Sequence, residues 1–156
     1  MLAELSATAL LLSGVGARAQ ERTEAPAGTT ANGIPAYVDG YLKWPKLNRV
    51  PIRGGSSAHQ GTKNVYASKR KTGSRYPVGT IVVKTGAEPG KKWLSLVATM
   101  RKVKGTKNGG WRWEEFTRSS PTARFTKVGF PESGCAACHS QAKSNDFVFT
   151  RRQSGS

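Results

Sequence analysis

The sequence places all of its cysteine chemistry in one short segment near its C-terminal end. Both cysteines of the 156-residue chain, Cys135 and Cys138, lie within GCAACHS (residues 134–140), and His139 follows the second cysteine directly. The chain has one other histidine, His59. Whatever fold the chain adopts must therefore serve three neighbouring reactive side chains at a single place.

A Cys-x-x-Cys pair has several common uses, and three of them fit poorly here. A tetrahedral zinc ion needs two more ligands. Only His59 and His139 are available, and His139 adjoins Cys138 too closely to share one ion with it. A thioredoxin-like redox pair belongs to a βαβ unit, and no such unit follows this segment. A disulfide between Cys135 and Cys138 would close a very small loop, so it would stabilise the fold only slightly.

Cys-x-x-Cys-His is the attachment sequence of c-type haem, and this use fits the segment. Two thiols three residues apart lie on about one helical turn, where each can form a thioether with a haem vinyl group. The next residue then presents its imidazole to the iron. We therefore predict one covalently attached haem c, with Cys135 and Cys138 as thioether donors and His139 as the iron ligand.

The N-terminal segment predicts export, which agrees with haem attachment outside the cytoplasm. Residues 7–16 (ATALLLSGVG) form an apolar run too short to span a membrane. Ala17-Arg18-Ala19 then has the small-x-small pattern of an export cleavage site. No Lys or Arg precedes the apolar run, so a buried N-terminal helix is the alternative interpretation. We expect a periplasmic or extracellular protein with no integral membrane span.

The length of the chain is that of one domain. We expect a signal peptide over residues 1–19, a disordered polar linker over 20–33, one haem domain over 34–152 and a tail over 153–156.

The chain is strongly basic, with 25 Lys and Arg against 9 Asp and Glu and a formal net charge of +16. These basic residues are spread in ones and threes from Lys43 to Arg152 and form no nucleic-acid recognition motif, so we expect no nucleic-acid partner. A surface of this charge attracts acidic partners or anionic surfaces. We therefore expect an acidic redox partner protein.

The middle of the chain predicts an antiparallel sheet. Short β-branched or aromatic runs alternate with Gly, Pro and Lys turns over residues 65–67, 80–85, 93–103 and 110–116. A short amphipathic helix precedes them, since near-helical spacing relates Ile34, Val38, Tyr41 and Trp44. The predicted fold class is α+β: a predominantly antiparallel β-sheet with a short N-terminal helix and a helix that carries the C-terminal haem-attachment motif.

Few residues could bind the iron opposite His139. Met100 alternates with Leu96 and Ala98 on one face of a predicted strand, so a place in the core is its simpler interpretation. His59 follows a Gly-Gly-Ser-Ser stretch on a predicted loop, where a surface or hydrogen-bonding role is simpler. The sequence therefore favours an open sixth position on the iron.

Lys84 interrupts the apolar run TIVVKT (80–85) and shares a strand face with Thr80 and Val82. Two interpretations are open. The run can be an edge strand whose lysine reaches solvent. Alternatively, the side chain points at the cofactor, where burial would lower its pKa and make the neutral amine nucleophilic.

Four segments follow one another as KNVYAS (63–68), YPVGTIVVK (76–84), GGWRWEEF (109–116) and CAACHSQAKSNDFVFTR (135–151). In this order they resemble the cytochrome P-460 family, and the resemblance extends from about Ile34 to Arg152. It implies an exported, mainly antiparallel-β protein, often a homodimer, with one haem c and a five-coordinate iron. In the hydroxylamine-oxidising members a lysine cross-links covalently to the macrocycle, and this role falls on Lys84.

The resemblance also implies a distal carboxylate that takes protons from the substrate, although no motif fixes its position. Glu114 and Glu115 are the clustered acids, and we expect them to point to opposite faces of their strand. Either is a candidate catalytic base. The oxidising members tend to carry an arginine where this chain has Lys63. The related cytochrome c′-β proteins bind nitric oxide without oxidising hydroxylamine.

We expect an oxidoreductase that acts on hydroxylamine or a similar small nitrogen species and passes electrons to an external acceptor. Two alternatives remain open. One is a protein that binds nitric oxide without turnover. The other is a simple electron carrier in which Met100 or His59 is the sixth iron ligand.

Overall fold

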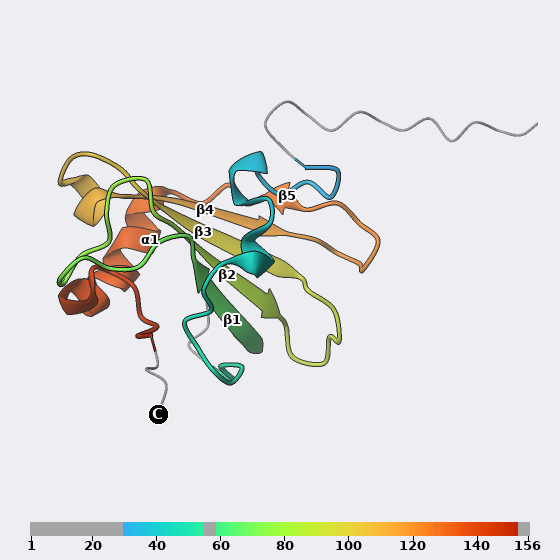
Figure 1. The fold of residues 1–156 in the computed structure, drawn as a ribbon. Helices are drawn as coiled ribbons and strands as arrows, with labels where there is room; N and C mark the ends of the chain where they lie inside the picture. The colour runs from blue at the N-terminus through green and yellow to red at the C-terminus, as the bar shows by residue number, and fades with distance from the viewer. Residues whose placement is uncertain (1–29, 55–58, 153–156) are drawn as a thin grey trace, which may run out of the picture.

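Five antiparallel strands form one sheet, and each strand pairs with the next one along the chain (Figure 1). They are β1 (Thr62–Ala67), β2 (Ile81–Ala87), β3 (Leu96–Lys102), β4 (Trp111–Thr117) and β5 (Thr126–Lys127). The first four coincide with the runs that the sequence predicts as strands. The sequence does not predict β5, because its two exposed residues carry no hydrophobic alternation.

The computed structural model describes residues 30–54 and 59–152. The predicted signal peptide, most of the predicted linker and the predicted tail lie outside the described residues. Within the described ranges, no helix is both long enough and apolar enough to cross a bilayer.

The sheet buries a cluster of side chains on each face, because successive residues of a strand point to opposite sides. In β2, Val82 belongs to one cluster and Val83 to the other. We call the side of Val82 the motif face, since Cys135 and Ala136 pack against its cluster. This cluster comprises Leu47, Val65, Ala67, Tyr76, Val82, Met100, Trp111, Trp113 and Val148.

The opposite side, which we call the N-terminal face, is covered by the first described segment of the chain. The predicted N-terminal helix is present as two short 3-10 helices, η1 (Ala36–Val38) and η2 (Tyr41–Lys43). Gly40 separates them with φ at 71°, a left-handed conformation that a continuing right-handed helix cannot contain. The buried residues still follow the predicted spacing, namely Ile34, Val38 and Tyr41.

The Cys-x-x-Cys-His motif lies on α1 (Glu132–His139), which packs beside β4 (Figure 1). Glu132 places a negative charge in the first turn, where the helix dipole favours it. Its carboxylate accepts hydrogen bonds from Arg112 Nε, at 2.7 Å, and from Trp113 N, at 3.3 Å. These bonds tie the start of α1 to β4, so they fix the position of the motif relative to the sheet.

Two further 3-10 helices flank the motif. One is η3 (Lys107–Gly110), directly before β4, and the other is η4 (Ser140–Asn145), which continues from the end of α1. After η4 the chain turns back into the motif-face cluster, where Val148 is buried.

Candidate functional site

Cys135 and Cys138 lie on the same side of α1, because residues three positions apart are neighbours on a helix surface. Both thiols are free, and Cys135 is half-buried while Cys138 is exposed. No group of three or more His, Cys, Asp or Glu in the described part of the chain could hold a metal ion. Because neither thiol is in a disulfide, both are available for covalent attachment.

His139 is the last residue of α1, and its ring contacts the rings of Trp113 and Phe149 at centroid distances of 4.5 and 5.0 Å. Its Nδ1 lies 2.7 Å from the carbonyl oxygen of Phe147. A carbonyl oxygen can only accept, so Nδ1 carries the proton and Nε2 is the nitrogen left for a metal. Burial is the main reason why the pKa of this imidazole lies below its usual value.

The accepting carbonyl belongs to an unusual turn of the backbone. Asp146 (φ 53°) and Phe147 (φ 66°) are consecutive non-glycine residues in the left-handed region. Such a conformation costs roughly 1–2 kcal/mol per residue. Phe147 N closes the turn with a hydrogen bond of 2.9 Å to Ala142 O. Further contacts offset this cost, and several of them involve Asp146.

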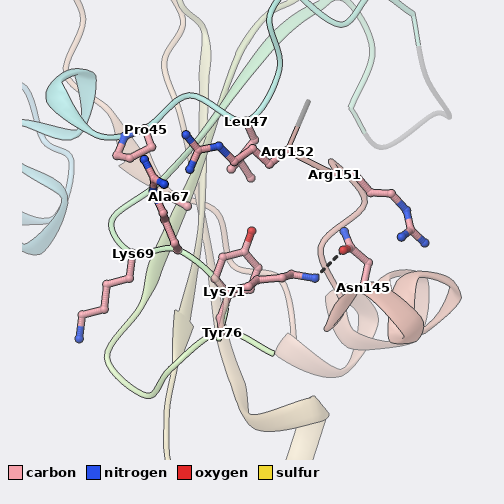
Figure 2. Close-up of a pocket in the computed structure, with 10 residues that line it drawn as sticks. Pro45, Leu47, Ala67, Lys69, Lys71, Tyr76, Asn145, Arg151 and Arg152 are labelled. Carbon is pink, nitrogen blue, oxygen red and sulfur yellow. Dashed lines mark hydrogen bonds between the residues drawn. The ribbon is translucent and has the colours of Figure 1, made fainter. Parts of the chain in front are cut away.

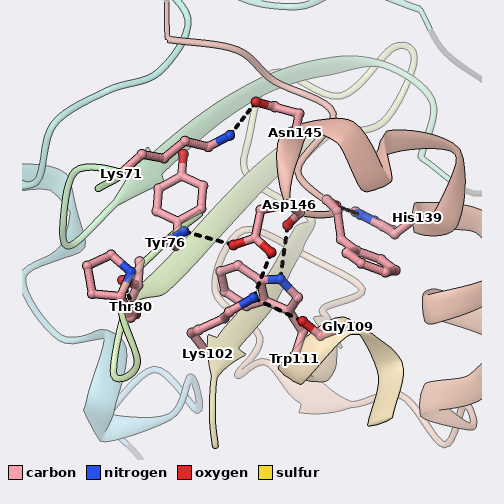
Figure 3. Close-up of polar contacts among 11 residues, drawn as sticks. Lys71, Tyr76, Thr80, Lys102, Gly109, Trp111, His139, Asn145 and Asp146 are labelled. Carbon is pink, nitrogen blue, oxygen red and sulfur yellow. Dashed lines mark hydrogen bonds and ion pairs between the residues drawn. The ribbon is translucent and has the colours of Figure 1, made fainter. Parts of the chain in front are cut away.

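Asp146 is buried and accepts hydrogen bonds at three of its atoms (Figure 3). Oδ1 accepts from Lys102 Nζ at 2.7 Å, and Oδ2 accepts from Tyr76 N at 2.8 Å. Its main-chain oxygen accepts from Trp111 Nε1 at 2.9 Å. Lys102 is buried as well and also donates to the carbonyl of Gly109, at 2.9 Å. Removing one partner of such a buried ion pair typically costs about 3–5 kcal/mol, because the other charge is left uncompensated.

Lys84 lies on the motif face, in one cross-strand row with Val65, Ala98 and Glu115. Its strand, β2, pairs on both sides, so the edge-strand interpretation of this lysine is wrong. Burial lowers the pKa of Lys84 to about 8, although the charge of Glu115 partly opposes the shift. The thiolate charges of Cys138 and Cys135, where these residues ionise, would oppose the shift as well. Lys84 therefore shares a local environment with the motif.

Glu115 faces the same side of the sheet, separated from Lys84 by the short side chain of Ala98. Burial raises the pKa of Glu115, and the nearby charge of Lys84 opposes this only in part. A carboxyl group with a raised pKa exchanges protons closer to neutral pH than an exposed one does.

His59 lies beside Glu115, which the sequence does not predict. Its Nε2 is 3.7 Å from Glu115 Oε2, a distance too long for a hydrogen bond. Burial lowers the pKa of His59 to about 4, with smaller contributions from the charges of Lys84 and His139. His59 is therefore neutral at pH 7. Lys63 is a residue of β1, and its Nζ donates to the carbonyl oxygens of Gly54 and His59. These hydrogen bonds connect both residues to that strand.

Two buried nitrogen atoms near these residues lack a hydrogen-bond partner among the residues that the structure describes, namely His59 Nδ1 and Trp113 Nε1. Buried polar atoms are normally satisfied, so a further group is expected beside them. The free thiols stand on one helical turn, and His139 has its Nε2 left for a metal. Together with the two unpaired nitrogens, these residues fit a c-type haem.

Glu114 and Met100 have other surroundings than Lys84, Glu115 and His59. Glu114 lies on the N-terminal face, where it accepts hydrogen bonds from Tyr37 Oη and from Lys127 Nζ, the latter at 2.6 Å. Burial alone would raise the pKa of Glu114, but these two hydrogen bonds bring it below its usual value. Met100 is buried in the motif-face cluster, in agreement with its simpler interpretation as a core residue.

A cavity of about 540 Å³ lies where β1 and the segment after it face the end of the described chain (Figure 2). Half of its ten lining residues are cationic, and none is acidic. The cationic residues are Lys69, Arg70, Lys71, Arg151 and Arg152. The two cysteines and His139 are not among its lining residues, whereas Leu47, Ala67 and Tyr76 of the motif-face cluster are. We call this cavity the basic cavity.

A family model described as Cytochrome P460 matches residues 38–150, which is well over half of the chain. The matched range contains β1 to β5, α1 and the turn at Asp146. No curated protein matches the chain.

The lowered pKa of Lys84 leads to a prediction about stability. The unfolded chain keeps this proton up to the ordinary value of 10.5, whereas the folded chain releases it near 8. The unfolded state therefore binds more protons between pH 8 and 10.5, and stability rises with pH in this window. We expect Lys84→Met to raise the free energy of unfolding at pH 7, and this gain over the wild type to shrink towards pH 10.5.

Urea unfolding of the full chain before haem attachment, at pH 7 and at pH 10, measures this difference. Lys43→Met removes the same charge from an exposed position and serves as the control. A gain for Lys84→Met that is equal at both pH values would show that burial of the charged amine is not its cause.

Proposed function

The chain belongs to the cytochrome P460 family, and from this premise we propose that it is an exported mono-haem c-type oxidoreductase that oxidises hydroxylamine or a similarly small nitrogen compound. The observation that carries the proposal is the convergence of four kinds of group on the motif face. They are the thiol pair, the imidazole of His139, the half-buried amine of Lys84 and the carboxyl group of Glu115.

The haem, when bound, would supply the redox chemistry and one open coordination position. Cys135 and Cys138 would hold it covalently, and His139 would bind the iron through Nε2 while its Nδ1–H continues to donate to the Phe147 carbonyl. Lys84 has a pKa of about 8, so a useful fraction of its amine is neutral and nucleophilic near neutral pH. In a covalent bond to the macrocycle, the Lys84 nitrogen would replace a hydrogen on a ring carbon and lose one of its own, so the bond would need a two-electron oxidant such as a peroxide; the neutral amine supports Lys84 as the nucleophile.

Glu115 is the base that we propose for the substrate protons. Its raised pKa brings its proton exchange closer to neutral pH than that of an exposed carboxyl group, and it lies on the same face as Lys84 and the motif. Glu114 has neither property, since it lies on the opposite face and its carboxylate is held ionised by two donors. In the overall reaction, hydroxylamine would lose electrons to an external acceptor and protons to solvent, and Glu115 would relay the protons one at a time.

We further propose that the electrons leave to an acidic partner protein that docks over the basic cavity. Five cationic side chains line this concave surface without an acidic neighbour among the lining residues. Such a surface accelerates and orients the approach of a negatively charged protein. The proposed site of action is outside the cytoplasm, after removal of residues 1–19.

We predict that the full chain, expressed with a c-haem maturation system, gains the mass of one haem. Cys135→Ala combined with Cys138→Ala should abolish covalent attachment, because no thioether donor remains. Intact-mass measurement after acidic solvent extraction decides the outcome, with Lys43→Ala as a control that keeps both thiols. A colourless wild-type protein of unchanged mass would contradict the proposal. A ferrous spectrum that is low-spin, six-coordinate and insensitive to carbon monoxide would support the electron carrier instead.

We predict that Glu115→Gln lowers kcat for hydroxylamine oxidation by roughly 10²–10⁴-fold, the usual contribution of a general base. Glu114→Gln is the matched control, because it makes the same substitution one residue away on the other face, and its kcat should stay close to the wild-type value. Steady-state kinetics with an artificial electron acceptor measure both. Equal losses in the two variants would contradict the role of Glu115. Tight nitric oxide binding without any hydroxylamine turnover would identify a nitric-oxide-binding protein.

The docking proposal is tested with small oxidants of opposite charge. The test variant replaces three exposed arginines of the basic cavity by glutamine, namely Arg70, Arg151 and Arg152. We expect oxidation of the reduced variant by the hexacyanoferrate(III) trianion to be slower than that of the wild type. Its oxidation by a cationic cobalt(III) chelate should not be slowed. The control removes three exposed lysines elsewhere, Lys43, Lys92 and Lys104. Stopped-flow rates that fall equally in both triple variants would show that only net charge matters, and would contradict docking at the cavity.

A further inference from the structure

We propose that Asp146 is a positioning residue for His139. By fixing the left-handed turn at Asp146 and Phe147, it holds the Phe147 carbonyl against His139 Nδ1, and so it sets the orientation and donor strength of the imidazole. This inference rests on the proposed function in one respect, namely that His139 binds the haem iron.

The contacts of Asp146 connect the turn to two strands of the sheet and to the segment that leads into a third (Figure 3). Tyr76 N precedes β2, Lys102 ends β3 and Trp111 begins β4, and each donates a hydrogen bond to Asp146. These donors lie 70, 44 and 35 positions away along the sequence. The turn is therefore anchored to the sheet and not merely to its own neighbours in the chain.

The segment between His139 and the turn does not explain the position of the carbonyl. It consists of η4, a 3-10 helix with non-helical backbone angles at Ala142 (φ −102°, ψ 21°). A short kinked helix of this kind defines the direction of the chain less strictly than an α-helix does. Phe147 also occupies a left-handed conformation that suits its bulky side chain poorly. Such a residue persists where the surroundings determine its conformation, and its carbonyl is the acceptor for Nδ1.

The hydrogen bond at Nδ1 has a chemical consequence for a metal at Nε2. An imidazole whose second nitrogen donates to an acceptor is a more basic ligand with a fixed ring orientation. A more basic ligand stabilises the ferric state, so it lowers the reduction potential of a haem. If Asp146 loses its carboxylate, the turn relaxes, the hydrogen bond weakens and the potential should rise.

A merely structural role makes a different prediction. If the pair of Asp146 and Lys102 serves only to anchor the C-terminal segment, its loss lowers stability and leaves the electronic properties of a bound haem unchanged. Val148→Ala supplies the matched control. Val148 lies two residues further on, buried in the motif-face cluster, and its side chain makes none of the hydrogen bonds of the turn.

The experiment uses the matured, haem-loaded full chain as wild type, Asp146→Ala, Asp146→Asn and Val148→Ala. Asparagine tolerates the left-handed conformation and keeps one acceptor oxygen, so it is the conservative variant. For each protein we would measure the melting temperature, the reduction potential and the iron–histidine stretching frequency of the ferrous form by resonance Raman spectroscopy. We expect Asp146→Ala to shift the stretching frequency down and the potential up, and Asp146→Asn to shift both less in the same directions.

Val148→Ala is expected to lower the melting temperature with no shift in either property. The proposal is wrong if Asp146→Ala melts earlier but keeps the wild-type frequency and potential, as a structural anchor would. Should Asp146→Ala fail to fold, Asp146→Asn decides by the same criterion. A wild-type protein that matures without haem would overturn the proposed function and this inference with it, whereas unchanged spectra in the Asp146 variants would overturn this inference alone.

Discussion

The hydrogen bond from His139 Nδ1 to the Phe147 carbonyl connects the motif to the rest of the protein. The motif alone supplies two thiols and an imidazole, but it does not decide which imidazole nitrogen is left for a metal. The hydrogen bond decides this, because the accepting carbonyl retains the proton on Nδ1. That carbonyl is in place because a left-handed turn directs it, and the turn depends on the buried pair of Asp146 and Lys102. The same ion pair therefore serves the core and the site.

The two faces of the sheet carry different groups. The motif face carries the residues proposed for catalysis, and the N-terminal face carries residues that support the fold. Alternation along β4 sends Glu115 to the motif face and Glu114 to the N-terminal face, although the two residues are adjacent. Glu114 then joins Tyr37 and Lys127 in a network that supports the N-terminal segment. A shift of one residue in the pairing of β4 would exchange the two roles, since the side-chain period of a strand is two.

The parts that the sequence predicts are those encoded in nearby residues. The first four strands follow from local alternation, the thiol pair from its spacing, and the opposite directions of Glu114 and Glu115 from strand geometry. The alternation could not say which glutamate faces the motif, because both faces of the sheet are buried. The contacts of Asp146 were also inaccessible, since its donors are distant in sequence and polar residues carry no periodic signal. The position of His59 beside Glu115 depends on the path of a loop, which periodicity does not determine.

The environments of Lys84 and Glu115 explain why these residues suit the roles proposed for them, Lys84 as a nucleophile and Glu115 as a catalytic base. Burial shifts the pKa of the lysine downward and the pKa of the glutamate upward, so both pKa values move towards neutral pH. The short side chain of Ala98 separates them across one strand, and each opposes the shift of the other only in part. Glu114, one residue away, receives two donors and shifts in the opposite direction. Any group that covers the motif face excludes more water, and so it increases the shifts of Lys84 and Glu115 while leaving Glu114 unaffected.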